Sequence, residues 1–178
     1  MKKITLSFLF CLACLIGMAQ GSTKLDLKDI TSGQYFPATI RNVVPMPDGE
    51  HYTQMNDEGT QITKYSFKTG EPVEVIFDVA KARECDFKHF DSYQFSPDGS
   101  KLLIATETTP IYRRSYTAVH YLYPLKRNDK GVTTNNIIER LSDGGPQQAP
   151  VFSPDGTMIA FVRDNNIFLV KTLYGNSE

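Results

Sequence analysis

Few residue patterns in this 178-residue sequence match a catalytic constellation. It contains no Gly-x-Ser-x-Gly elbow, so the usual nucleophile of a serine hydrolase is absent. The three histidines, His51, His89 and His120, are scattered without metal-ligand spacing, and no glycine-rich phosphate loop follows a strand-like segment. The acidic pair Asp57-Glu58 lies in a predicted turn and is interpreted as solvated charge. We therefore expect no catalytic residue, no metal site and no cofactor.

One polar stretch is unusual, Ile111-Tyr112-Arg113-Arg114-Ser115-Tyr116. It lies between the predicted second and third strands of a four-strand unit, after a predicted excursion at 107–110. In such an antiparallel unit this connection emerges on the same face as the one that enters the innermost strand. Arg113 or Arg114 could then point toward a central cavity. The alternative is that both are ordinary exposed arginines between packing tyrosines.

The elements that would position these arginines are repeated along the chain. Pro-Asp-Gly occurs at 47–49, 97–99 and 154–156, at intervals of roughly 50 residues. Each copy follows an apolar stretch and precedes an alternating one. Proline sets φ at the first corner of a tight turn, aspartate bonds back to the backbone, and glycine takes the positive-φ position. Each copy therefore predicts a strand, a turn and a second strand.

Further strand-like segments follow each hairpin, and none keeps the apolar spacing of a full-length helix. They are 61–67, 71–78, 117–125, 136–141 and 167–171. Four short antiparallel strands in about 50 residues are typical of a propeller blade. The sequence thus predicts an all-β fold, a partial β-propeller of about two and three-quarter blades. A generic β-sandwich, in which Pro-Asp-Gly is merely a common turn, is the alternative.

The repeat also predicts how the chain is divided. We expect a signal peptide at 1–19, a lead-in at 20–42 and the partial propeller at 43–178, with blades around 43–80, 90–142 and 148–178. The third blade lacks its outer strand, which residues 25–41 could supply. A three-bladed ring would have almost no interior, and propellers close with about four to eight blades. We therefore interpret the chain as the front part of a longer propeller.

The first residues have the layout of a secretory signal peptide. Lys2 and Lys3 precede an apolar run over 4–16, and Gly17-Met18-Ala19 supplies small residues before a cleavage site. The run is too short for an uncleaved membrane span, which needs about 20 apolar residues. A lipid anchor on Cys14 is a further alternative. The sequence predicts an exported protein, periplasmic or extracellular.

Charge and cysteine content narrow the function classes. Lys and Arg number 19 against 20 Asp and Glu, which excludes a strongly basic nucleic-acid binder and an acidic disordered tail. Removal of 1–19 leaves Cys85 as the single cysteine, so no internal disulfide is expected. Its acidic neighbours Glu84 and Asp86 disfavour the thiolate, which predicts a packed, inert thiol.

Two segments resemble the dipeptidyl peptidase IV family. Tyr112-Arg113-Arg114-Ser115-Tyr116-Thr117-Ala118, followed by Tyr121-Leu122-Tyr123-Pro124-Leu125, is similar to the family's Trp-Arg-His-Ser-Tyr-Thr-Ala and Tyr-Asp-Ile-Tyr-Asp-Leu. The runs at 149–162 and 165–170 are similar to the next blade of the same family, in order and nearly in spacing. The resemblance covers residues 90–178 well and residues 25–89 loosely.

This resemblance implies an exported serine exopeptidase that removes an N-terminal dipeptide with Pro or Ala in second place. Its propeller of eight blades would sit over an α/β-hydrolase domain downstream. Arg113 matches the family arginine that contacts the carbonyl oxygen of the substrate's first residue, while Tyr112 stands where the animal enzymes have Trp. The family's Glu pair and its Ser, Asp and His would lie beyond residue 178. The implied partner is a peptide with a free N-terminus, and a homodimer of the longer protein stays open.

Three functions remain at this point. The chain could be the front piece of a prolyl dipeptidyl peptidase, inactive alone but part of its substrate gate. It could belong to a related peptidase that cleaves other peptides. It could also be a non-catalytic periplasmic propeller that binds proteins. A Glu-Glu pair and a Gly-x-Ser-x-Gly elbow downstream would favour the first function, the elbow alone the second, and neither the third.

Overall fold

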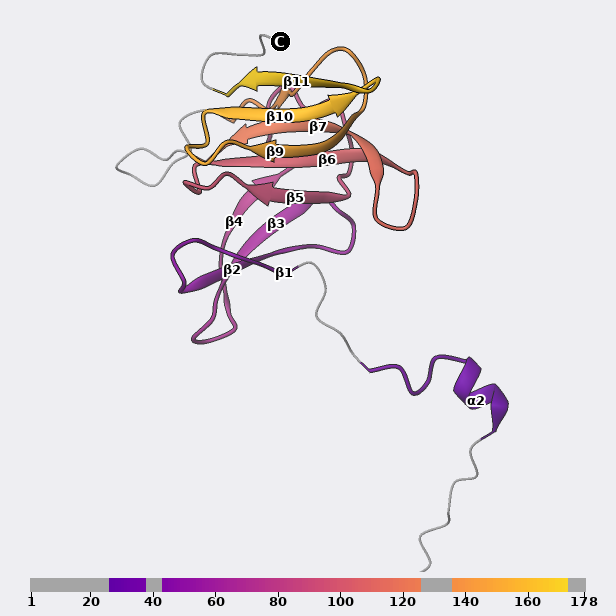
Figure 1. Cartoon of the computed structure of the whole chain (residues 1–178). Helices are drawn as coiled ribbons and strands as arrows, with labels where there is room; N and C mark the ends of the chain where they lie inside the picture. The colour runs from indigo at the N-terminus through magenta and orange to yellow at the C-terminus, as the bar shows by residue number, and fades with distance from the viewer. Residues whose placement is uncertain (1–25, 38–42, 126–135, 173–178) are drawn as a thin grey trace, which may run out of the picture. The chain divides into compact units, whose positions relative to one another are not determined.

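The computed structural model describes residues 26–37, 43–125 and 136–172 (Figure 1). The chain divides into two compact units, Met1–Thr39 and Ile40–Glu178. The described part of the first unit contains one short helix, α2 (Leu27–Thr31), which has no buried residue. The predicted signal peptide at 1–19 and much of the lead-in at 20–42 lie outside the described residues.

The second unit is built from antiparallel strands, which confirms the all-β prediction. A four-stranded sheet, the first strand group, has the order β1-β2-β3-β4 and is drawn in purple and magenta in Figure 1. Its strands are β1 (Val43–Pro45), β2 (His51–Met55), β3 (Gln61–Ser66) and β4 (Pro72–Asp78). Each strand pairs with its neighbour in sequence, so the group is a simple meander.

The remaining strands form one seven-stranded sheet with the order β11-β10-β9-β7-β6-β5, in which β8 also pairs with β7. The second strand group is β5 (Ser92–Phe95), β6 (Lys101–Pro110), β7 (Tyr116–Pro124) and β8 (Glu139–Arg140). The third strand group is β9 (Gln147–Phe152), β10 (Met158–Arg163) and β11 (Asn166–Lys171). The two groups join where Thr117 pairs with Gln148 and Ala118 with Gln147.

All three Pro-Asp-Gly turns form as predicted. Each glycine N–H donates to the carbonyl three residues earlier, at 3.2 Å for Gly49, 2.8 Å for Gly99 and 2.9 Å for Gly156. The glycines have φ of 70°, 66° and 68°, the left-handed region that the turn requires. Successive turns also meet, because the Lys101 ammonium donates to the Gly156 carbonyl at 3.4 Å.

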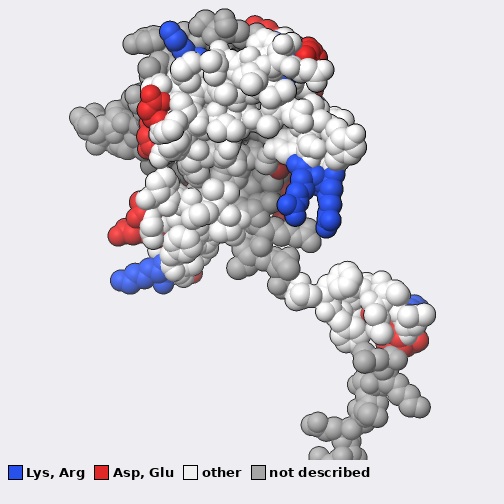
Figure 2. All heavy atoms as spheres, in the orientation of Figure 1, with Lys and Arg blue, Asp and Glu red and all other residues white. Residues whose placement is uncertain are grey.

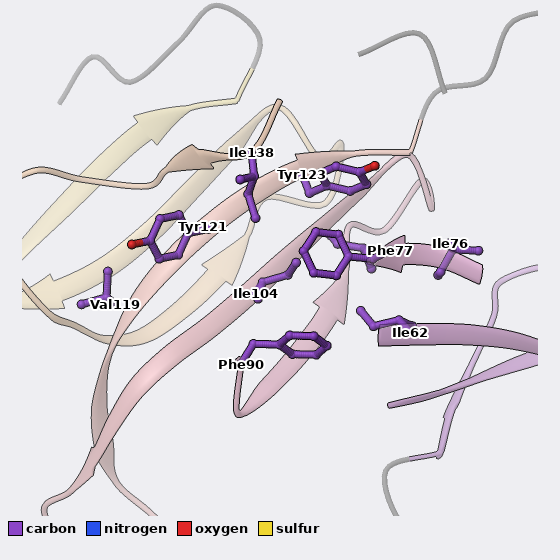
Figure 3. Close-up of a cluster of buried hydrophobic side chains, with 10 residues drawn as sticks. Ile62, Ile76, Phe77, Phe90, Ile104, Val119, Tyr121, Tyr123 and Ile138 are labelled. Atoms are coloured by element: carbon purple, nitrogen blue, oxygen red, sulfur yellow. The ribbon is translucent and has the colours of Figure 1, made fainter. Parts of the chain in front are cut away.

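The core lies on both faces of β6 and β7. Side chains alternate between the two faces of a strand, so Leu102 and Ile104 face one way and Leu103 the other. The first face belongs to a cluster that includes Ile62 and Phe77 of the first strand group (Figure 3). The opposite face belongs to a cluster with the third strand group, whose buried members are Leu103, Leu122, Leu141, Ile159, Phe161 and Val170.

Two strand predictions are wrong in extent. The expected excursion at 107–110 is instead a continuation of β6, and Pro110 pairs with Tyr116. A register shift between Thr106 and Thr109, with Glu107 at a φ of 52°, absorbs the extra residue as a bulge would.

The outer strand expected at 136–141 shortens to β8, because residues 136–138 bond elsewhere. The Arg83 N–H donates to the Asn136 carbonyl at 2.8 Å, and the Ile138 N–H donates to the Arg83 carbonyl at 3.1 Å. These bonds divert the chain toward the segment that connects the first and second strand groups, where Ile138 is buried.

Candidate functional site

The paired arginines lie in the turn that joins β6 to β7. The N–H groups of Ile111 and Tyr112 both donate to the Ser115 carbonyl, at 2.8 Å and 3.2 Å. This closes the turn and leaves Arg113 and Arg114 exposed at its tip. Figure 2 shows basic side chains projecting at the free end of this hairpin, on the right of the view. The structure thus places both residues in the connection where the strand order predicts them.

A cleft of about 420 Å³ opens beside this hairpin. It is bounded by β5, β6, β7 and the first half of β9. The residues that line it are Ser92, Tyr93, Gln94, Leu103, Ala105, Arg114, Ser115, Tyr116, His120, Gln148, Ala149 and Pro150. Arg114 is among them and Arg113 is not, so only one of the two neighbouring arginines lines the cleft.

A buried histidine closes the inner end of the cleft. His120 is 2% exposed and Gln147 is fully buried. The Nδ1 of His120 lies 3.0 Å from the Oε1 of Gln147, which also accepts the backbone N–H of His120 at 2.9 Å. Burial lowers the pKa of His120, while the hydrogen bonds to Gln147 and to the Ala118 backbone oppose that shift. The imidazole is therefore neutral at neutral pH.

The cleft has the chemistry of a binding site. Its floor is apolar, because it is formed by Leu103 and Ala105. Both side chains are almost completely buried. Hydroxyl and amide groups are also among the lining groups, and Arg114 supplies a permanent charge with several donors. Neither Ser92 nor Ser115 is hydrogen-bonded to His120 within the described residues, so no serine here has an activating base. The arrangement can hold a carbonyl or a carboxylate, and it contains no nucleophile.

Comparison with known proteins identifies this region. Residues 96–178 match the family model described as the dipeptidyl peptidase IV N-terminal region, and they include the β6–β7 hairpin and β9. This part of the chain is a dipeptidyl peptidase IV N-terminal region. The family resemblance of the Tyr112–Ala118 segment is thereby confirmed, and so is the relation of the third strand group to that family.

Individual relatives extend the dipeptidyl peptidase IV likeness toward the N-terminus. The chain is similar to Porphyromonas gingivalis dipeptidyl peptidase 4, with 42% sequence identity and a TM-score of 0.73 over 88% of this chain and 22% of that one. It is 27% identical over 150 residues to human prolyl endopeptidase FAP, covering 82% of this chain and 17% of that protein. It is also 38% identical over 77 residues to a probable dipeptidyl-aminopeptidase B of Emericella nidulans, covering 43% and 8%. The chain therefore spans less than a quarter of the length of these relatives.

Within the described part of this dipeptidyl peptidase IV region and the strands before it, no group of three or more His, Cys, Asp or Glu could hold a metal ion. No helix there is long and apolar enough to cross a membrane. Cys85 is half-buried against the core, as predicted. Burial raises the pKa of its thiol, which donates to the Phe87 carbonyl at 3.4 Å.

Sequence reasoning missed the His120–Gln147 pair and the cleft that it closes. The signal was present in the alternation of β7, where His120 has the same parity as Ala118 and Leu122. A polar residue at a core-facing position needs a buried partner. That partner lies 27 residues away in the chain, and no local pattern points to Gln147.

Proposed function

We propose that this chain is the N-terminal propeller portion of an exported dipeptidyl peptidase. The longer protein would be a serine exopeptidase that releases Xaa-Pro and Xaa-Ala dipeptides. Its catalytic serine would come from an α/β-hydrolase domain downstream, because the present sequence has no Gly-x-Ser-x-Gly elbow. The role of the described strands would be to bind and gate the peptide.

The observation that carries this proposal is the position of the family-like segment. Residues 112–118 begin at an exposed hairpin tip. The same chain is 42% identical to a dipeptidyl peptidase 4 over 88% of its length. Exposed loops held by rigid strands are where binding residues concentrate. Arg113 on this tip is the residue that we propose for contact with the substrate.

Arg113 has the chemistry that this role needs. A guanidinium is permanently charged and presents several donors in a fixed plane, so it can hold a peptide carbonyl oxygen at a set distance. The two hydrogen bonds to the Ser115 carbonyl restrict the backbone of the turn that carries it. Holding the first residue of the peptide would position the dipeptide relative to a distant nucleophile.

Export is part of the proposal. Lys2 and Lys3, the apolar run at 4–16 and the small residues at 17–19 support a cleaved signal peptide. N-terminal sequencing of exported protein should begin at or near Gln20. Recovery of exported protein with Met1 intact would contradict this part.

The test uses the full-length parent protein and an Xaa-Pro reporter peptide. Arg113→Ala should lower kcat/KM about ten- to a hundredfold, because a hydrogen bond to a charged group contributes about 1.5–3 kcal/mol. Arg114→Ala is the matched control and should have a smaller effect, since Arg114 faces the cleft. The 178-residue chain alone should cleave nothing.

Two results would overturn the proposal. One is a parent protein that binds peptides without releasing any dipeptide, which would favour a non-catalytic propeller. The other is full activity of the Arg113→Ala variant, which would remove the hairpin tip from the substrate site.

A further inference from the structure

We propose that the cleft beside Arg114 is a second binding site, which takes the carboxylate of a short peptide. The carboxylate can come from an Asp or Glu side chain or from a peptide C-terminus. The inference rests on the proposed function only in taking a peptide as the ligand. It assigns to Arg114 a role separate from the one proposed for Arg113.

The charge of the cleft points to an anion. Arg114 is the charged side chain among the described residues that line it, and none of those residues is acidic. His120 adds no charge at neutral pH, because its burial lowers the pKa of the imidazole. The structure pairs Arg114 with no carboxylate within the described residues. A positive charge over a concave, partly apolar surface attracts an anionic group.

The shape of the cleft suits a small organic ligand. Its volume of about 420 Å³ lies within the range of roughly 300–1,000 Å³ for small-molecule sites. Leu103 and Ala105 are apolar and almost fully buried, while Gln94 and Gln148 contribute amides to the lining. Such a surface can cover the aliphatic part of a residue while Arg114 binds its carboxylate at the edge.

The walls are held in place before any ligand binds. The Gln94 side chain donates to the Pro150 carbonyl at 3.5 Å and so bridges β5 to β9. Between Gln148 and Pro150, Ala149 has a φ of 50°, a left-handed conformation that costs free energy for a residue with a Cβ. Such backbone strain is concentrated at binding sites, and here it falls on a residue that lines the cleft.

A carboxylate matches the site better than a phosphate does. One guanidinium forms a bidentate ion pair with one carboxylate, so the charges balance. A phosphate group carries up to two negative charges, which Arg114 alone would leave partly unpaired in the cleft. The neutral amides and hydroxyls of the other walls are suited to the main chain of a peptide.

Binding to the full 178-residue chain tests this inference without any catalysis. The probes are acetyl-Ala-Glu-Ala-amide, its Gln counterpart, and acetyl-Ala-Ala-Ala with a free C-terminal carboxylate. The acetyl group blocks the amino terminus, so recognition of a free N-terminus cannot account for the result. We expect at least one of the two carboxylate peptides to bind about tenfold more tightly than the Gln peptide at low salt, measured by calorimetry.

Arg114→Ala should abolish that preference, and Arg113→Ala should keep it. The Arg113→Ala control removes the same charge from the same turn. It therefore distinguishes binding in the cleft from a general effect of the positive charge of the hairpin. Thermal melts of both variants should match the parent chain, since both side chains are exposed. Arg114→Lys should retain only part of the preference, because an ammonium cannot form the bidentate ion pair.

Equal binding of all three peptides would overturn the inference, and so would equal loss in the two alanine variants. Which carboxylate peptide is preferred identifies the source, a side chain or a C-terminus. If the chain does not discriminate while Arg113→Ala still lowers kcat/KM of the parent, the proposed function stands and the second site falls. If the chain does discriminate while Arg113→Ala leaves kcat/KM of the parent unchanged, the cleft stands as a peptide site. The proposed contact of Arg113 with the substrate then falls.

Discussion

The Nδ1 of His120 lies 3.0 Å from the Oε1 of Gln147, and the same oxygen accepts the backbone N–H of His120 at 2.9 Å. A backbone N–H can only donate, so the oxygen end of the amide must face His120 and Nδ1 must carry the proton. The other end of the amide donates to the Gly145 carbonyl. The pair therefore links β7 to the segment that begins β9 and fixes one tautomer of the imidazole.

We predict that acidification destabilises the chain through His120. Burial lowers its pKa below the ordinary 6.5 in the folded state. The unfolded chain then binds a proton more readily, so the free energy of unfolding falls as pH drops below about 6.5 toward the folded pKa. Melting temperatures at about pH 7.5 and pH 5 should show this fall.

His120→Gln should weaken that pH dependence, because glutamine does not titrate. His89→Gln, at an exposed histidine, should leave the dependence as it is. An equal response of the two variants would show that His120 is not the titrating group.

The Pro-Asp-Gly turn of the second strand group gives a separate prediction. The Asp98 carboxylate accepts the hydroxyls of Ser96 and Ser100 at 2.5 Å and 2.6 Å and the backbone N–H of Ser100 at 3.1 Å. These bonds, led by that of the Ser100 hydroxyl, hold the pKa of Asp98 well below its usual range. The stability that they provide is present above about pH 4 and is lost as pH falls toward the folded pKa.

Asp98→Ala should lower the free energy of unfolding by about 1 kcal/mol near neutral pH, a figure reduced because the group is exposed to solvent. Urea unfolding measures the change. Asp57→Ala, in an exposed turn without these hydroxyl contacts, is the control and should have little effect. A loss that does not shrink at low pH would show that the charge of Asp98 is not its source.

The local parts of this fold could be predicted from sequence, and the reason is visible in the turns. Asp98 bonds to residues two positions away on either side, and Gly99 needs only its own φ, so a five-residue pattern contains the whole interaction. In the strand after it, β6, the side chains point alternately to the two faces of the sheet, so odd and even positions face opposite ways. Hairpins, strand order within each group and the place of the arginine pair followed from such short patterns.

The cleft could not be predicted in the same way. His120 and Gln147 are far apart in sequence, and they meet only because β9 pairs with β7 over two residues. The bulge at Glu107, which keeps β6 paired as far as Pro110, likewise depends on the partner strand. Whether Arg113 or Arg114 faces a cavity is set by these contacts. The sequence therefore predicted where the pair lies, but not which of the two arginines lines the cleft.

Packing between the first and second strand groups yields a prediction on Phe77. Its side chain is 1% exposed, and its ring centroid lies 5.6 Å from that of Phe90 and 4.9 Å from that of Tyr123 (Figure 3). Phe77→Ala should lower the free energy of unfolding by about 3–5 kcal/mol, the cost of a cavity in a packed core. Chemical denaturation of the full chain gives the value.

Val73→Ala, on the same strand at an exposed position, is the matched control and should change stability by less than about 0.5 kcal/mol. Similar losses for the two variants would mean that the contact between the strand groups does not stabilise the chain.

The last prediction concerns Gly59, in the turn between β2 and β3. It has a φ of 64°, and its carbonyl accepts the Phe90 N–H at 2.8 Å. A Cβ on Gly59 would lie 2.5 Å from the Phe90 carbonyl oxygen, which is backbone and cannot rotate away. Gly49 has a nearly equal φ of 70° and open space where its Cβ would be. Both alanine variants carry the cost of a left-handed residue, about 1–2 kcal/mol. Only Gly59→Ala adds the clash, so its loss of unfolding free energy should exceed that of Gly49→Ala by about 1–3 kcal/mol. Urea unfolding of the two variants side by side measures this difference. Equal losses would mean that the approach of Phe90 to the turn is loose, and that the first strand group is not fastened to the second at this point.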